Sequence, residues 1–202
     1  MPSPPLIWPS VLTPSDEVAG VKDLSAHLMG LQYSVDAWEA ALLLYQTALN
    51  PPAGISRSAA SRWRFIACNE CVLELYHLRA RLEKTQSAQL GKCPSLRPLI
   101  DVAVLRGARK ELDEHFPDIE LLRHAVAHRG ENEAHPDVHA ENGMFALSGF
   151  REPNVFSIPY KGTLRRLPIT NESLGKINAA VTRFFSAFAV ASAELESQGH
   201  LE

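Results

Sequence analysis

Long stretches of the chain repeat apolar residues every three or four positions, which is the spacing of an amphipathic α-helix. The first stretch runs from about Val18 to Leu49 and ends at Asn50-Pro51-Pro52, because proline lacks the amide donor that a helix needs. A second runs from about Ser58 to Gln86. A third follows the loop Gly91–Ser95 and can hold Pro98 in its first turn. The pattern predicts long helices throughout the first half of the chain.

The pattern changes in the second half. A short fourth helix is predicted at about Ile119–His128. Short runs with β-strand character follow it, at Met144–Leu147, Val155–Ile158 and Thr163–Leu167. Thr170 or Asn171 caps a last helix, whose apolar stripe continues without a break to Ala191.

We therefore predict a mostly α fold, an up-and-down bundle of about five helices with a small β-hairpin or meander before the last helix. The β insertion covers about residues 143–168. Residues 1–16 contain five prolines and predict an extended N-terminal arm that packs on the body or stays mobile. Residues 17–200 are expected to form a single helical domain.

Composition limits the function classes. Hydrophobic residues make up 46% of the 202 residues, which is enough for a core, and the net charge of −3 argues against a protein that coats nucleic acid. Three cysteines, an odd number, argue against a disulfide framework. No run approaches the roughly 18 apolar residues of a membrane span. The first 11 residues lack Lys and Arg, unlike a signal or transit peptide. We expect a cytoplasmic protein that does not enter a membrane.

The fourth predicted helix carries the most informative residues. Arg123, His124 and His128 stand on an otherwise apolar segment, just before the helix ends. The simplest interpretation is structural, because cations near the last turn complement the negative end of the helix dipole.

The same residues carry a resemblance to a known family. Arg123, then the polar residue His124, then three residues and His128 resemble the R-[NDH]-x3-H motif of HEPN domains. Those are α-helical bundles found in prokaryotic toxin–antitoxin, abortive-infection and RNA-processing proteins. The segment Phe116–Glu120 before the motif and the helical frame from 18 to 197 look similar too. Catalytic members cleave RNA without a metal, and members without activity also exist.

The resemblance implies a role for each motif residue. His128 would match the histidine that handles the proton of the ribose 2′-hydroxyl, and Arg123 the arginine that stabilises charge on the phosphate. His124 would match the position that assists. The chemistry is reasonable, because neutral imidazole is a competent base near pH 7 and a guanidinium binds two phosphate oxygens at once. The implied function is a cofactor-free endoribonuclease of a toxin–antitoxin or phage-defence type, with single-stranded RNA as substrate and an antitoxin as partner.

Helix geometry adds a condition. At 100° per residue, Arg123 and His128 are about 140° apart around an ideal helix, whereas His124 and His128 share a face. Either the arginine stem reaches round, or the helix end is distorted, or two copies meet across a two-fold axis and exchange residues. HEPN proteins resemble the last case, so we predict a homodimer.

Two other hypotheses stay open. The chain could be a non-catalytic binding or regulatory module that keeps the helical frame. It could also be a metal-dependent enzyme, since His124 and His128 have the spacing of two metal ligands and His135 and His139 repeat it. However, Ala125 stands where a zinc protease motif has its glutamate, and we expect no metal.

Basic residues that could bind RNA are found on the fourth predicted helix and in the β insertion that follows it. The basic residues there are Arg123, Arg129, Arg151, Lys161, Arg165 and Arg166. Of these, Arg129, Arg165 and Arg166 are candidate RNA-binding residues. We expect Phe156 and Tyr160 to pack on the bundle instead of stacking on bases. The acids Glu111, Asp113, Glu114 and Asp118 are expected in solvent.

Other polar residues have simpler interpretations. Cys68-x2-Cys71 lacks the second pair that a structural zinc site needs, and Cys71 is expected in the core. Cys93 could be a lone surface thiol. His27 and His77 fall near apolar stripes and are expected to be structural histidines.

Overall fold

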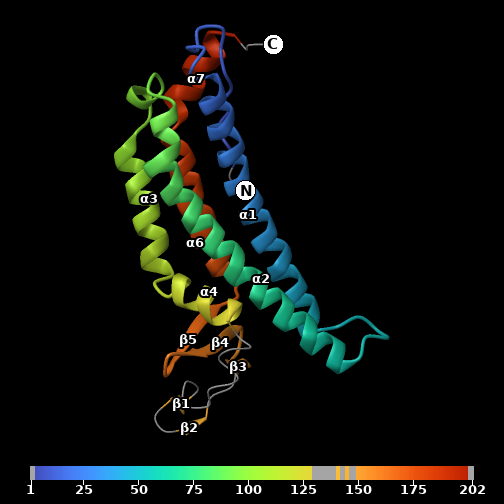
Figure 1. The fold of residues 1–202 in the computed structure, drawn as a ribbon. Coiled ribbons are helices and arrows are strands. Elements are labelled where there is room, and N and C mark those ends of the chain that lie inside the picture. Colours follow the sequence, from blue (N-terminus) through green and yellow to red (C-terminus); the bar gives the residue numbers. More distant parts are fainter. Residues whose placement is uncertain (1–2, 129–139, 142–143, 146–148, 200–202) are drawn as a thin grey trace. The chain divides into compact units, whose positions relative to one another are not determined.

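The computed structural model describes residues 3–128, 140–141, 144–145 and 149–199 (Figure 1). The candidate residues Arg129, His135 and His139 lie outside the described residues. The chain divides into two compact units. The first consists of Met1–Val35, His77–His115 and Lys176–Glu202, and the second of Asp36–Tyr76 and Phe116–Gly175.

The fold is mostly helical, as the sequence predicts. The α-helices of the described residues are α1 (Val18–Leu49), α2 (Arg57–Lys84), α3 (Val102–His115), α4 (Ile119–Ala127), α6 (Asn171–Ser186) and α7 (Ala189–Ser197). The division between the units falls inside α1 and α2, each of which is one continuous helix, and inside α6. None of the helices among the described residues is long and apolar enough to cross a membrane.

In the first unit, the proline-rich arm packs against α7. Ile7 is fully buried, and the Ser10 hydroxyl donates to Oε1 of Gln198 at 2.6 Å. Ser192 of α7 in turn donates from its hydroxyl to the carbonyl oxygen of Leu6. The sequence left open whether the arm packs on the body or stays mobile, and in the structure it is packed.

The segment between α2 and α3 differs from the prediction. Pro98 lies in a 3-10 turn, η3 (Arg97–Leu99), instead of the first turn of α3. The extended backbone of Ile100 ends this turn. Helix α3 starts after Asp101, whose carboxylate accepts the amides of Ala103 and Val104 in the first turn of the helix. Before η3 lie a π-helical turn, η1 (Thr85–Gln89), and a 3-10 turn, η2 (Leu90–Lys92).

The prediction of one unbroken last helix was wrong. The helix stops at Ser186 and α7 begins at Ala189, because the amides of Ala187 and Phe188 bond to carbonyls only three residues back. The carbonyl oxygen of Ala187 accepts the amide of Asp101 instead of a helical partner. The apolar stripe continues through the break, which is why the pattern did not show it.

The second unit contains the β insertion. Strands β3 (Gly149–Glu152), β4 (Val155–Tyr160) and β5 (Thr163–Pro168) form an antiparallel sheet in the order β3-β4-β5. This confirms a meander before the last helices, but its first strand lies at Gly149–Glu152 and not at the predicted Met144–Leu147. A further pair, β1 (Ala140–Glu141) and β2 (Met144–Phe145), precedes it. The β4–β5 turn has positive φ at Lys161 and Gly162, as a two-residue hairpin turn of type I′ requires.

An aromatic cluster joins this sheet to the helices of the second unit. Phe156 is 1% exposed, and its ring lies 6.3 Å from Phe65 and 6.0 Å from Phe150. Tyr45 packs on Phe150 at 5.6 Å, and the guanidinium of Arg64 lies 3.9 Å above the same ring. The expectation that Phe156 packs on the bundle is confirmed.

The three cysteines are all buried. Cys71 lies in the core as predicted. The interpretation of Cys93 as a surface thiol was wrong, since this residue, which directly follows the η2 turn, is fully buried. Burial raises the pKa of Cys68 to about 12 and that of Cys93 to about 11, and it also raises the pKa of Cys71. All three are therefore unreactive thiols at neutral pH.

Candidate functional site

The candidate site lies at the carboxyl end of α4, in the second unit. Ile119, Leu122 and Ala125 are buried, which orients the helix and leaves Arg123 and His124 half-buried beside that face. The last helical residue is Ala127. His128 caps the helix with non-helical backbone angles (φ −107°, ψ 26°), and its amide donates to the carbonyl oxygen of His124 at 3.0 Å.

His124 lies between the other two motif residues. Arg123 donates from Nη1 to Nδ1 of His124 at 3.4 Å. A guanidinium has only donors, so Nδ1 must be the acceptor and the proton of the neutral ring lies on Nε2. On its other side, the His124 ring runs nearly parallel to that of His128, with centroids 6.1 Å apart and 21° between the planes. The structure thus connects Arg123 to His124, and His124 to His128.

Tyr76 of α2 supports the arginine. The guanidinium carbon of Arg123 lies 5.2 Å from the centroid of the Tyr76 ring. Attraction between the cation and the electron-rich face restricts the position of the guanidinium, and is worth about 0.5–2 kcal/mol in general. Tyr76 belongs to an apolar row of α2, so sequence reasoning gave it no role at the site.

Tyr160 packs on a helix, as the sequence predicted, but sequence reasoning gave it no place at the site. Its ring lies 6.3 Å from that of His124, at only 10° between the planes. Next to it in the β4–β5 turn, Nζ of Lys161 lies 5.3 Å from the Tyr160 centroid. The tip of the hairpin therefore brings an aromatic ring and a cation to the end of α4.

The hairpin also has a contact at the start of α4. Arg165 of β5 donates from Nη1 to Oδ1 of Asp118 at 3.1 Å. Figure 1 shows α4 lying against β4 and β5, and the two contacts, Asp118–Arg165 and His124–Tyr160, fix the sheet at both ends of the helix. The sequence predicts the turn that follows Tyr160. It does not predict that the Tyr160 ring packs against α4.

The other candidate residues lie as follows. Arg165 is part of the ion pair with Asp118, and the exposed Arg166 lies 3.7 Å from a carboxylate oxygen of Glu152. Asp118 is therefore a paired, half-buried acid. The acids of α3 are also paired, with Glu111 3.1 Å from Arg183 and Asp113 2.6 Å from Arg79.

The remaining histidines of the helices separate into two cases. His27 is buried, and its Nε2 donates to the carbonyl oxygen of Arg81 at 2.9 Å, as expected of a structural histidine. Burial lowers the pKa of His27. His77 is exposed on α2. Within the described part of the chain, no three His, Cys, Asp or Glu side chains are grouped as metal ligands.

Comparisons with protein-family models, curated proteins and solved structures found no match to this chain.

Proposed function

We propose that the protein is a metal-independent endoribonuclease of the HEPN type that acts on single-stranded RNA. The observation that supports this most is the group at the end of α4, where Arg123 bonds to His124 and His124 lies parallel to His128. One permanent cation and two imidazoles supply the charge and the proton transfer that this cleavage needs. The motif resemblance supplies the identity of the reaction.

The proposed reaction uses the ribose as nucleophile. His128 takes the proton of the 2′-hydroxyl, and the 2′-oxygen forms a bond to the adjacent phosphorus. Arg123 stabilises the added negative charge on the phosphate oxygens. The bond from phosphorus to the 5′-oxygen then breaks, that oxygen takes up a proton from water, and His128 releases its proton to the solvent. The products are a 2′,3′-cyclic phosphate and a 5′-hydroxyl.

The hydrogen bond between Arg123 and His124 defines what His124 can do. With Nδ1 accepting from the guanidinium, His124 presents Nε2–H as a donor. A donor in that position serves a phosphate oxygen or the leaving 5′-oxygen, and not the 2′-hydroxyl. This supports the proposed role of His128 as the base and of His124 as the assisting residue. Lys161 at the hairpin tip adds a second cation for the substrate phosphate.

An RNA cleavage assay in excess chelator tests the proposal. Purified protein is incubated with a single-stranded oligoribonucleotide in EDTA, and we expect cleavage at the same rate as without chelator. Cleavage that depends on added divalent metal would replace the proposal with a metal-dependent enzyme. Absence of cleavage at high protein concentration would replace it with a non-catalytic binding module.

We also propose that the active form is a homodimer in which Arg123 of one copy acts with His128 of the second copy. On an ideal helix the two residues lie about 140° apart, and within one copy the ring of His124 lies between them, so a second copy can place Arg123 directly beside His128. The resemblance to toxin–antitoxin and defence proteins extends the proposal to a cytoplasmic toxin held by an antitoxin.

Mixing two inactive variants tests the dimer. Arg123→Ala and His128→Ala proteins, unfolded and refolded together, should recover about a quarter of the wild-type cleavage rate. Random pairing makes half of the dimers mixed, and each mixed dimer has one intact site of two. No recovery, or a wild-type mass equal to the 22.3 kDa of one chain, would contradict the dimer.

A further inference from the structure

A groove in the first unit lies between the end of α2 and the start of α3. Its volume is about 320 Å3, and its lining includes Arg97, Arg106, Arg109, Ser87, Leu90 and Val102. A second hollow of about 370 Å3 adjoins it along α3 and shares Arg106 and Arg109 with it. Both volumes are in the range of small-molecule sites.

Two of the arginines that line the groove have unbalanced charge. Arg109 lies 3.3 Å from a carboxylate oxygen of Glu83 and 3.6 Å from one of Asp113, so acids balance its charge. The guanidinium groups of Arg97 and Arg106 make no ion pair or hydrogen bond with any other described residue. With three arginines against one glutamate on its wall, the groove carries a net positive charge.

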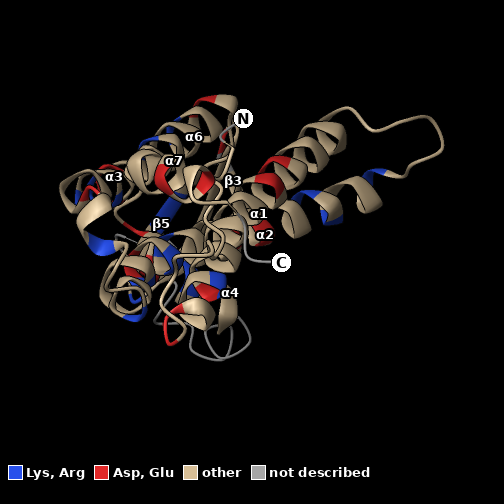
Figure 2. Cartoon of the chain, turned by 90° about the horizontal axis from the view of Figure 1, so that it is seen from above, with Lys and Arg blue, Asp and Glu red and all other residues tan. Residues whose placement is uncertain are grey.

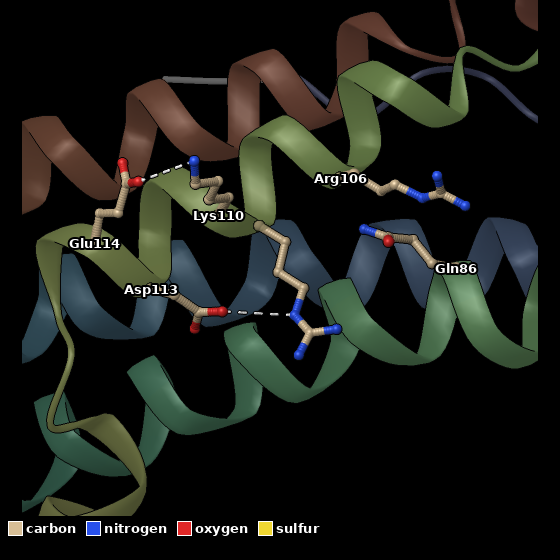
Figure 3. A pocket seen from close by; sticks show the side chains of 6 residues that line it. Gln86, Arg106, Lys110, Asp113 and Glu114 are labelled. Carbon is tan, nitrogen blue, oxygen red and sulfur yellow. Dashed lines mark ion pairs between the residues drawn. The ribbon is translucent and has the colours of Figure 1, made fainter.

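Figure 3 shows the adjoining hollow along α3. Arg106 extends from α3 near Gln86 of the opposite wall, while Glu114 faces Lys110 and Asp113 faces Arg109. The amide of Gln86 is held, since its Nε2 donates to the carbonyl oxygen of Leu105 at 3.0 Å. Figure 2 shows blue and red side by side on α3, in agreement with these pairs. The guanidinium of Arg106 is therefore the cation left for a ligand on this wall.

The wall opposite α3 has an unusual backbone. Gln86 and Ser87 belong to the π-helical turn Thr85–Gln89, where the amide of Leu90 bonds to the carbonyl oxygen of Thr85, five residues back. This π-helical turn continues directly from the end of α2 at Lys84 and is followed by the 3-10 turn η2, so irregular helical backbone forms this wall. Just beyond it, a Cβ built on Gly91 would meet no atom within 4 Å, so the groove is open there.

From these observations we propose that the groove binds a small organic phosphate. The phosphate group lies between the guanidinium groups of Arg97 and Arg106, because guanidinium donors match two phosphate oxygens. The organic part of the ligand lies on Leu90 and Val102, the apolar residues of the lining. This site is separate from the residues of α4 and does not depend on RNA cleavage.

Phenyl phosphate and inorganic phosphate are the probes that test the groove. Titration of isotope-labelled protein, followed by backbone amide NMR, should shift the amides of Ser87, Gly91 and Arg106 and saturate with a Kd for phenyl phosphate below about 1 mM. Inorganic phosphate should bind more weakly, because it lacks the group that contacts Leu90 and Val102. Equal binding of both probes, no saturation, or shifts confined to other residues would overturn the proposal.

Two variants and a matched control locate the binding. Arg97→Gln combined with Arg106→Gln should weaken phenyl phosphate binding about tenfold or more. Gly91→Leu leaves every charge in place but fills the groove, and should weaken binding as strongly. The control, Arg57→Gln combined with Arg62→Gln, removes the same charge from exposed positions of α2 outside the groove. If the control weakens phenyl phosphate binding equally, the effect comes from net charge alone, and the proposed site in the groove is overturned.

Discussion

Replacement of His128 by alanine should lower the rate of RNA cleavage by a factor of about 10²–10⁴, the usual contribution of a positioned general base. His128 is the exposed cap of α4 and its ring lies beside that of His124, so the variant removes proton transfer without opening the core. Arg123→Ala should cost about 10²–10³, the usual loss when one group that stabilises the charged transition state is removed. The measurement is the single-turnover cleavage rate of a labelled oligoribonucleotide in EDTA.

Two further variants make that result specific. His115→Ala removes an exposed histidine at the end of α3 and should cleave at the wild-type rate. Arg123→Lys keeps the charge but loses the paired donors of the guanidinium, and should fall between wild type and Arg123→Ala. Wild-type rates in His128→Ala, or an equal loss in His115→Ala, would show that α4 does not carry the reaction.

The largest effect on stability is expected at Phe156. Its ring is 1% exposed and packs between Phe65 and Phe150, so Phe156→Ala leaves a cavity where the β sheet meets the helices of the second unit. Substitutions of this kind lower the free energy of unfolding by about 3–5 kcal/mol. Urea unfolding followed by tryptophan fluorescence and circular dichroism measures the change.

A second substitution at the same position shows how much of the lost stability comes from the lost apolar volume. Phe156→Leu keeps most of the apolar volume and should cost less than about 1.5–2 kcal/mol. Because β4 carries both Phe156 and Tyr160, the alanine variant should also release the Tyr160 ring from His124 and lower RNA cleavage. A loss below about 1 kcal/mol in Phe156→Ala would mean that the aromatic cluster does not hold the sheet in place.

The sequence predicted the ends of the helices best where neighbouring residues in the chain determine them. The ends of α1 follow from an uninterrupted apolar stripe and from Pro51 and Pro52, both of which act within one turn of the helix. The break between α6 and α7 could not be predicted, because it depends on the amide of Asp101, more than 80 residues earlier in the chain. The same limit explains Cys93, whose burial depends on packing that its loop-like sequence does not encode.

The candidate site also contains residues that neighbouring sequence identifies and residues that only distant contacts identify. Arg123, His124 and His128 could be identified because motif and spacing are local. Tyr76 and Tyr160 could not, since their roles come from α2 and from a hairpin that the Asp118–Arg165 pair positions on α4. The sequence also predicted Asp118 to be a solvated acid, because nothing near it in the chain indicates its partner Arg165.

Cleavage of an RNA strand that contains one 2′-deoxynucleotide tests the central claim most directly. In excess EDTA, we predict cleavage at the ribonucleotides with 2′,3′-cyclic phosphate and 5′-hydroxyl ends, and none at the bond that follows the deoxynucleotide. That bond lacks the 2′-hydroxyl from which His128 would take its proton. Mass spectrometry of the fragments identifies both the position of cleavage and the groups at the new ends. Cleavage after the deoxynucleotide, or fragments with 5′-phosphate ends, would contradict the proposed use of Arg123, His124 and His128.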